Sequence, residues 1–124
     1  MKKIIAKNAP APVGPYSHAI LKKNMLFISG QLPVVPETKE LIKNDIQKEA
    51  TQALDNLGAI LKEAGMDYSS VVKCTIFITD MSLFAKVNEV YSLYFSEPFP
   101  ARETVQVSAL PLGANLEISA IAMK

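Results

Sequence analysis

The chain has 124 residues, 49% hydrophobic and 20% charged, a composition that predicts one globular domain over residues 1–124 and excludes a disordered chain. Thirteen basic and 12 acidic residues leave a net charge of +1, so the charge gives no indication of a nucleic-acid partner. A single cysteine excludes an internal disulfide, and no stretch is apolar enough for a membrane span or a signal-peptide core. We therefore expect a cytoplasmic protein with no membrane partner.

The N-terminal part is predicted to form a hairpin after an irregular start. Three prolines between residues 10 and 15 mark an irregular segment, and a short strand over residues 3–5 fits before it. Apolar runs at 19–21 and 25–28 then flank a short polar turn, which predicts a β-hairpin. We expect Asn24 to take the turn position that needs a positive φ.

A long helix is the clearest element of the sequence. From Ile46 to Ala64, apolar residues recur at intervals of three and four, the spacing of one helix face. Asn44 or Asp45 can cap its first turn, and Gly65 can end it. The preceding residues 31–42 contain two prolines and are expected to form a loop.

The second half predicts a strand, a second helix and two more strands. Residues 69–80 are rich in β-branched side chains and predict a strand. A helix is expected over about 82–95, with its apolar face formed by Leu83, Val87, Val90, Tyr91 and Tyr94. Strands over 102–109 and 115–123 follow. The order β-β-α-β-α-β-β predicts an α+β fold, a mixed sheet with two helices on one face.

The predicted sheet has more apolar surface than two helices can cover. One face of the strand predicted over residues 69–80 is expected to consist of Val72, Cys74, Ile76 and Ile78. The opposite face of that strand still carries Phe77, and the last strand likewise carries Ile121 and Met123 opposite its core side. An apolar surface of this extent usually marks an interface, so we predict a homo-oligomer.

Arg102 follows Phe99-Pro100-Ala101 at the start of a predicted strand. Side chains alternate along a strand, so Arg102, Thr104 and Gln106 share one face, and Glu103 is not expected to pair with Arg102. If Arg102 lies unpaired on the uncovered, interface-forming face, it can hold a planar carboxylate through two parallel hydrogen bonds. The alternative is an arginine that is solvated or ion-paired at a sheet end.

Five further residues have both a structural and a functional interpretation. Glu117 interrupts the apolar run NLEISAIA, where it can face solvent, pair with a lysine or act as an acid–base group. Tyr16 either packs or points into a site. Ser29 and Gly30 end a strand, where glycine makes an ordinary turn or lets a ligand approach the backbone. Asn88, on the second helix, faces water or bridges to another subunit.

Metal chemistry and nucleophilic catalysis lack the residues they need. His18 is the only histidine and Cys74 the only cysteine, whereas a zinc site takes three or four such ligands. No serine or cysteine triad fits around a single histidine, and no glycine-rich phosphate loop occurs. We expect Cys74 to be a small core hydrophobe, and neither a metal nor a cofactor to be needed.

Five stretches in chain order are similar to the RidA family, also called YjgF: GPYSHA, FISGQLP, DMSLFAKVNEVY, FPARETVQVSALP and LEISAIA. The resemblance covers essentially the whole chain, and the PAR stretch with the downstream LPxxAxxEI pattern is its most specific part. It implies a chorismate-mutase-like α+β fold and a homotrimer with active sites between subunits. It also implies hydrolysis of 2-aminoacrylate, 2-iminopropanoate and 2-iminobutanoate, reactive intermediates of pyridoxal-phosphate dehydratases, to 2-keto acids and ammonium.

The resemblance assigns roles to individual positions. It implies that Arg102 binds the substrate carboxylate and that Glu117 positions the hydrolytic water. The pocket residues that it implies are Tyr16, Ser29, Gly30, Asn88 and Thr104. Thr104 stands where cysteine is frequent, Glu103 where a small residue is common, and Ser119 where a second glutamate is frequent. These departures bear on pocket polarity and substrate preference.

Membership of such a family leaves other functions open. A non-catalytic keto-acid sensor that regulates amino-acid metabolism would need only the arginine, so the presence of Glu117 favours an enzyme. A ribonuclease or translation inhibitor is a second alternative, against which the near-neutral charge and single histidine weigh. A holdase chaperone, which would use exposed apolar surface and not Arg102, is a third.

Overall fold

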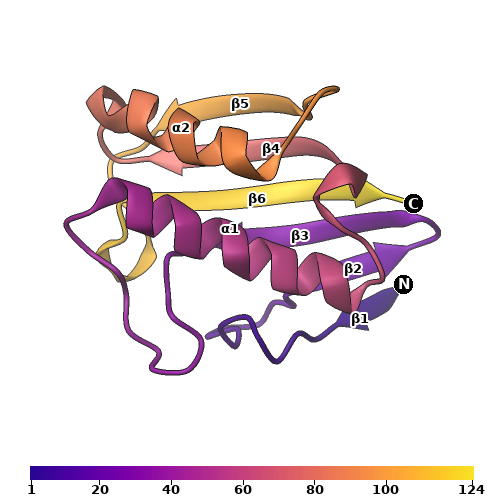
Figure 1. Cartoon of the computed structure of the whole chain (residues 1–124). Helices are drawn as coiled ribbons and strands as arrows, with labels where there is room; N and C mark the ends of the chain where they lie inside the picture. Colours follow the sequence, from indigo (N-terminus) through magenta and orange to yellow (C-terminus); the bar gives the residue numbers. More distant parts are fainter.

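A computed structural model describes all 124 residues as one six-stranded sheet with two α-helices packed against it (Figure 1). The strands are β1 (Lys2–Ile4), β2 (Ala19–Lys22), β3 (Met25–Gln31), β4 (Val71–Ile78), β5 (Ala101–Gln106) and β6 (Leu116–Met123). The helices are α1 (Ile46–Glu63) and α2 (Phe84–Tyr94). Neither helix combines the length and the apolar character needed to cross a membrane.

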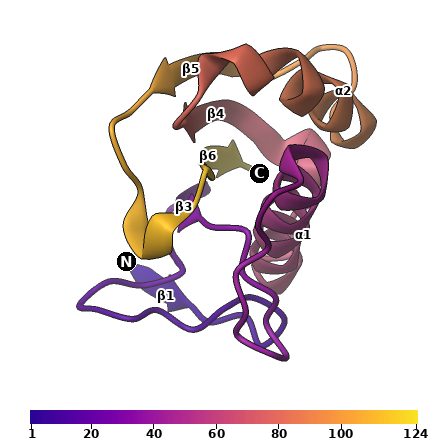
Figure 2. The same cartoon turned by 90° about the vertical axis from the view of Figure 1, so that its left-hand side faces the viewer.

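The sheet is mixed, as predicted, and both helices cover the same face. Its strand order is β1-β2-β3-β6-β4-β5. Only β4 and β5 run parallel, because α2 forms the crossover between them; every other pair is antiparallel. In Figure 2 both helices lie on one side of the sheet, and no α-helix lies on the other.

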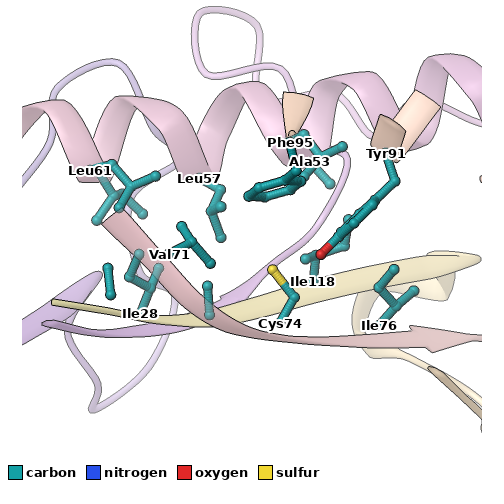
Figure 3. Packing of buried hydrophobic residues seen from close by; sticks show 14 of the residues in the cluster. Ile28, Ala53, Leu57, Leu61, Val71, Cys74, Ile76, Tyr91, Phe95 and Ile118 are labelled. Carbon is teal, nitrogen blue, oxygen red and sulfur yellow. The ribbon is translucent and has the colours of Figure 1, made fainter. Parts of the chain in front are cut away.

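Helix α1 forms where its apolar spacing predicts it. The Asp45 side chain accepts a hydrogen bond from the Lys48 N–H at 3.1 Å and caps the first turn, and Gly65 has a φ of 72° just beyond the last turn. Every apolar residue of the predicted stripe is buried. Figure 3 shows α1 side chains packed over β4 and β6, with Cys74 fully buried in this core, as expected of a small hydrophobe.

Three details differ from expectation. In the hairpin turn Lys23, not Asn24, has positive φ, 56°. A bulge near the start of β4 shifts its register against β6, so Val71 is buried and Val72 is 44% exposed. Strand β5 ends at Gln106, whose side chain accepts the hydrogen bond of the Met81 N–H and so ties the strand end to the turn before α2.

The face without helices is substantially apolar, as predicted. Phe27, Val105 and Met123, on three different strands, are 43%, 42% and 38% exposed. This uncovered face also carries the only ion pair of the chain, between Lys73 and Glu103 at 3.2 Å. It is the surface that an oligomer would bury.

Candidate functional site

The guanidinium of Arg102 lies over two aromatic rings of α2. Its Cζ is 4.7 Å from the ring centroid of Tyr91 and 5.2 Å from that of Phe84. Arg102 pairs with Cys74 in the parallel ladder, so both side chains leave the sheet on the helix-covered side. Arg102 therefore does not lie on the uncovered, interface-forming face on which the sequence argument placed a carboxylate-binding arginine; the parallel pairing of β5 with β4 sets its direction.

No protein group neutralises Arg102. The guanidinium donates no hydrogen bond and belongs to no ion pair. Glu103 points away, as predicted, and contacts Lys73 and Thr75. The N–H groups of Arg102 therefore remain available for an anion, which a guanidinium can bind in two places.

An open groove beside α2 leads to this charge. The groove has a volume of about 660 Å³ and is lined by Asn88, Glu89, Tyr91, Ser92, Phe99, Pro100 and Arg102. Two of the predicted site residues, Asn88 and Arg102, thus come together; we call this the arginine groove. Sequence reasoning missed Tyr91 and Phe84 as the support for the guanidinium, because only the parallel register brings β5 under α2.

The floor beneath Arg102 is uncharged. The Thr104 hydroxyl, two residues along the same strand face, is buried without a hydrogen-bond partner, and so is the Tyr91 hydroxyl. Figure 3 shows the latter pointing toward the sulfur of Cys74. Burial raises the pKa of both Tyr91 and Cys74, so both remain neutral. A bound anion would therefore meet a single positive charge over an uncharged floor; the one carboxylate that lines the groove, Glu89, accepts a hydrogen bond from the Gln47 side chain.

Glu117 lies on the other face of the sheet. It pairs with Phe77 of β4, three residues from Cys74, so its side chain projects to the uncovered side. The carboxylate is partly buried and has neither a hydrogen bond nor a lysine partner. Burial raises the pKa of Glu117 above its ordinary value.

Gly30 makes room for Glu117. A Cβ on Gly30 would lie 2.5 Å from the Glu117 carboxyl carbon, so the glycine is required by a close approach rather than by turn geometry. The neighbouring Ser29 hydroxyl donates to the Ser17 carbonyl at 2.6 Å, and the Ser29 N–H donates to the His18 carbonyl at 3.0 Å. Ser29 thus fixes the chain that leads to Tyr16.

Tyr16 is half exposed and does not serve as core packing. Together with Gly30 it lines a cavity of about 340 Å³ whose walls come mainly from residues 7–13 and 31–39 and from Leu112. A cavity of this size suits a small molecule. We call Tyr16, Ser29, Gly30 and Glu117 the glutamate pocket; Tyr16 and Gly30 line the cavity, whereas Ser29 and Glu117 lie next to Gly30 and do not line it.

The structure therefore divides the predicted site residues into two groups. Asn88, Arg102 and Thr104 belong to the helix-covered side, and Glu117 with Gly30 belongs to the uncovered side. The sheet separates the Arg102 guanidinium from the Glu117 carboxylate within one chain. One chain alone cannot place both groups on the same small ligand.

The titratable residues show no metal-binding arrangement. No group of three or more His, Cys, Asp or Glu side chains could hold a metal ion. The single histidine, His18, is buried and engages both ring nitrogens: Nδ1 accepts from the Ala6 N–H at 3.1 Å, and Nε2 donates to the Pro10 carbonyl at 2.6 Å.

The chain closely matches known proteins over its full length. A family model described as Endoribonuclease L-PSP matches residues 6–124. A protein of Bos taurus named 2-iminobutanoate/2-iminopropanoate deaminase is 47% identical, and the alignment covers 100% of this chain and 91% of the bovine one. The crystal structure of RidA from an Antarctic Psychrobacter is 44% identical, with a TM-score of 0.96 and complete coverage of both chains. E. coli TdcF with bound serine is 42% identical, with a TM-score of 0.95, and covers 100% of this chain and 99% of TdcF.

These matches, with the fold, define an α+β protein of the YjgF-like type with a mixed sheet and two helices on one face. The chain belongs to the RidA family, also called YjgF, as its sequence motifs indicate. The roles of individual residues and the trimeric state remain predictions.

Proposed function

We propose that this protein is an imine and enamine deaminase that hydrolyses 2-aminoacrylate, 2-iminopropanoate and 2-iminobutanoate to 2-keto acids and ammonium. The observation that carries the proposal is the unpartnered Arg102 guanidinium at an open groove. The name of the bovine relative, a 2-iminobutanoate/2-iminopropanoate deaminase, supports this substrate class. No cofactor takes part in the proposed reaction.

The complete site forms between copies of the chain, in a homotrimer. Because Arg102 and Glu117 lie on opposite faces of one sheet, the arginine groove of one copy meets the glutamate pocket of the next. The uncovered apolar face supplies the contact surface. Asn88 and Thr104 then enter the site with Arg102, and Tyr16, Ser29 and Gly30 enter with Glu117.

Arg102 binds the one fixed anionic group of the substrate. All three substrates and their products carry a carboxylate, which a guanidinium can hold through two parallel hydrogen bonds. The rings of Tyr91 and Phe84 limit where the guanidinium can move. The substrate is thereby oriented with its reacting carbon toward the glutamate pocket.

Glu117 positions the hydrolytic water and transfers its protons. The enamine 2-aminoacrylate first takes a proton on its CH2 carbon, loses one from its nitrogen and so becomes the imine. The carboxylate accepts a proton from water as the water oxygen bonds to the imine carbon, and the proton passes to nitrogen. A proton then moves from the new hydroxyl group to the amino nitrogen, the C–N bond breaks as the carbon–oxygen double bond of the keto acid forms, and the ammonia that leaves takes up a proton from water to become ammonium.

A coupled assay tests the activity. Threonine dehydratase generates 2-iminobutanoate, and the release of 2-ketobutyrate is followed with and without this protein. We expect the wild type to accelerate release and Arg102→Ala not to do so. Equal release with and without the wild type would refute the deaminase.

Mixing subunits tests the composite site. Arg102→Ala and Glu117→Gln subunits, each inactive alone, are unfolded together and refolded. With random mixing, about a quarter of head-to-tail interfaces pair an intact Arg102 with an intact Glu117, and activity should return to that level. No recovery would show that both residues serve the site from the same chain.

A keto-acid sensor is the second candidate. The E. coli relative TdcF holds serine in its crystal structure, which supports the binding of a small carboxylate ligand by a protein of this fold. Keto-acid binding without any acceleration of imine hydrolysis would favour the sensor.

A further inference from the structure

His18 is the only polar attachment of an eight-residue irregular segment. Residues 6–13 lie between β1 and the turn that leads to Tyr16, outside every helix and strand. The hydrogen bonds that join them to the rest of the chain are the two made by the His18 ring, to the Ala6 N–H at 3.1 Å and to the Pro10 carbonyl at 2.6 Å. The ring itself is 5% exposed.

This pair of hydrogen bonds requires one particular protonation state. A neutral ring with its proton on Nε2 can accept at Nδ1 and donate at Nε2, which matches the donor Ala6 N–H and the acceptor Pro10 carbonyl. A second proton, on Nδ1, would place two N–H donors face to face. The bond to Ala6 would then be lost, whereas the bond to Pro10 would remain.

The segment held by His18 forms a wall of the cavity beside the glutamate pocket. Ala9, Pro10, Pro12 and Val13 line this cavity together with Tyr16 and Gly30. The ionisable side chains that line it near His18 are Lys7, Lys39 and Tyr16. No carboxylate lines it, so no acidic partner compensates a protonated ring.

We propose that His18 is a positioning residue that holds residues 6–13 as one wall of the cavity that Tyr16 and Gly30 also line, and that a second proton on its ring frees the Ala6 end of this wall. The part of this inference that concerns substrate rests on the proposed function. Acid supplies this second proton, so a comparison at lowered pH tests whether the Ala6 bond depends on the neutral ring. Weaker substrate binding, seen as a higher KM, is the expected consequence.

Glutamine provides a matched variant. Its side-chain oxygen can accept from the Ala6 N–H while its nitrogen donates to the Pro10 carbonyl, and it does not titrate. His18→Gln should therefore keep both bonds at every pH. His18→Ala removes both bonds, whereas acid removes only the bond to Ala6, so this variant should lower Ala6 protection at every pH at least as far as acid does in the wild type.

The experiment compares the wild type and His18→Gln between pH 7.5 and 5.5. Amide hydrogen exchange, corrected for the intrinsic exchange rate at each pH, reports the Ala6 N–H, and the imine assay reports KM and kcat. In the wild type we expect Ala6 protection to fall about tenfold, the equivalent of one buried hydrogen bond, and KM to rise with it. In His18→Gln both should stay constant. Titration of Glu117 acts equally on the two proteins and cancels in the comparison.

Each outcome decides a separate point. Ala6 protection that is equally pH-dependent in both proteins, or constant in both, would overturn the role of His18. Loss of protection in the wild type with an unchanged KM would overturn its link to the pocket. Absence of imine hydrolysis in both proteins would refute the proposed function, while hydrogen exchange would still decide whether His18 holds the segment. His18→Ala adds weight only if its circular dichroism shows a folded protein.

Discussion

The Glu117 carboxylate and the Gly30 backbone lie in such close contact that no side chain at position 30 leaves that carboxylate in place. The two residues are distant in sequence and meet because β3 pairs with β6. The site thus depends on a glycine that has no chemistry of its own.

Gly30→Ala should therefore impair activity more than stability. The clash falls on the far end of a flexible side chain, so Glu117 is expected to turn aside at a cost of about 1 kcal/mol, the scale of a poor rotamer. A catalytic group displaced by about 1 Å can lower the rate about 10²-fold. Turnover and urea denaturation measure the two effects. Gly14→Ala is the control, because its Cβ would meet only Tyr16 ring atoms at 3.7 Å; equal turnover of the two variants would contradict the prediction.

Substitutions of Arg102 and of Glu117 should have different effects on ligand binding. We expect Arg102→Ala to weaken 2-ketobutyrate binding roughly 10- to 150-fold, corresponding to about 1.5–3 kcal/mol for a charged hydrogen bond. Arg102→Lys should restore little, because an ammonium cannot match a carboxylate in two places. Glu117→Gln should bind normally but turn over roughly 10²–10⁴-fold more slowly. Calorimetry gives the affinities, with the exposed Lys48→Met as control; normal binding by Arg102→Ala would remove the carboxylate-binding role.

Glu117→Gln should also stabilise the protein at neutral pH. Burial raises the folded-state pKa of Glu117, so the folded chain holds this proton more tightly than the unfolded chain. The stability that this carboxyl contributes is therefore full below its unfolded-state pKa and is lost as the pH rises through the folded-state value. Glutamine does not ionise and avoids this loss. We expect a higher denaturation midpoint for the variant at pH 7 and a difference that vanishes toward about pH 4; the opposite pH trend would show that Glu117 gains a partner on assembly.

A charge on the uncovered face should prevent assembly. Light scattering of the wild type should give about three times the chain mass of 13.5 kDa, and Phe27→Glu should give the single-chain mass without turnover. Phe27 is 43% exposed in the single chain, so the variant should still fold by circular dichroism. Leu93→Glu, at an 82% exposed position on α2, should leave assembly intact. A monomeric wild type would refute both the trimer and the shared site.

The elements of this fold were predictable where local spacing determines them. The apolar stripe, the Asp45 cap and Gly65 are sufficient to define α1, because helix periodicity and capping act over a few residues. Alternation along β5 likewise predicts that Arg102 and Glu103 point to opposite faces. Such patterns also predict an uncovered apolar face, since two helices are too few for one sheet.

The relationships between distant strands could not be read in this way. Alternation along β5 does not show which face of the strand meets the helices. The parallel register of β5 with β4 determines this, and it directs the Arg102 side chain toward α2 rather than to the uncovered face. The contact between Gly30 and Glu117 requires the pairing of β3 with β6. The bonds of His18 depend on an irregular segment with no periodicity at all.

Because Arg102 and Glu117 lie on opposite sides of one sheet, the chain has two different surfaces that each carry half of a site. Copies that join through these sides do so head to tail, and a pair completes one site while one unmatched arginine groove and one unmatched glutamate pocket remain at its ends. Closure into a ring removes both ends, so that the number of sites equals the number of chains. Activity per chain should therefore be higher in the closed ring than in an open pair, and ring closure becomes a condition for full catalysis.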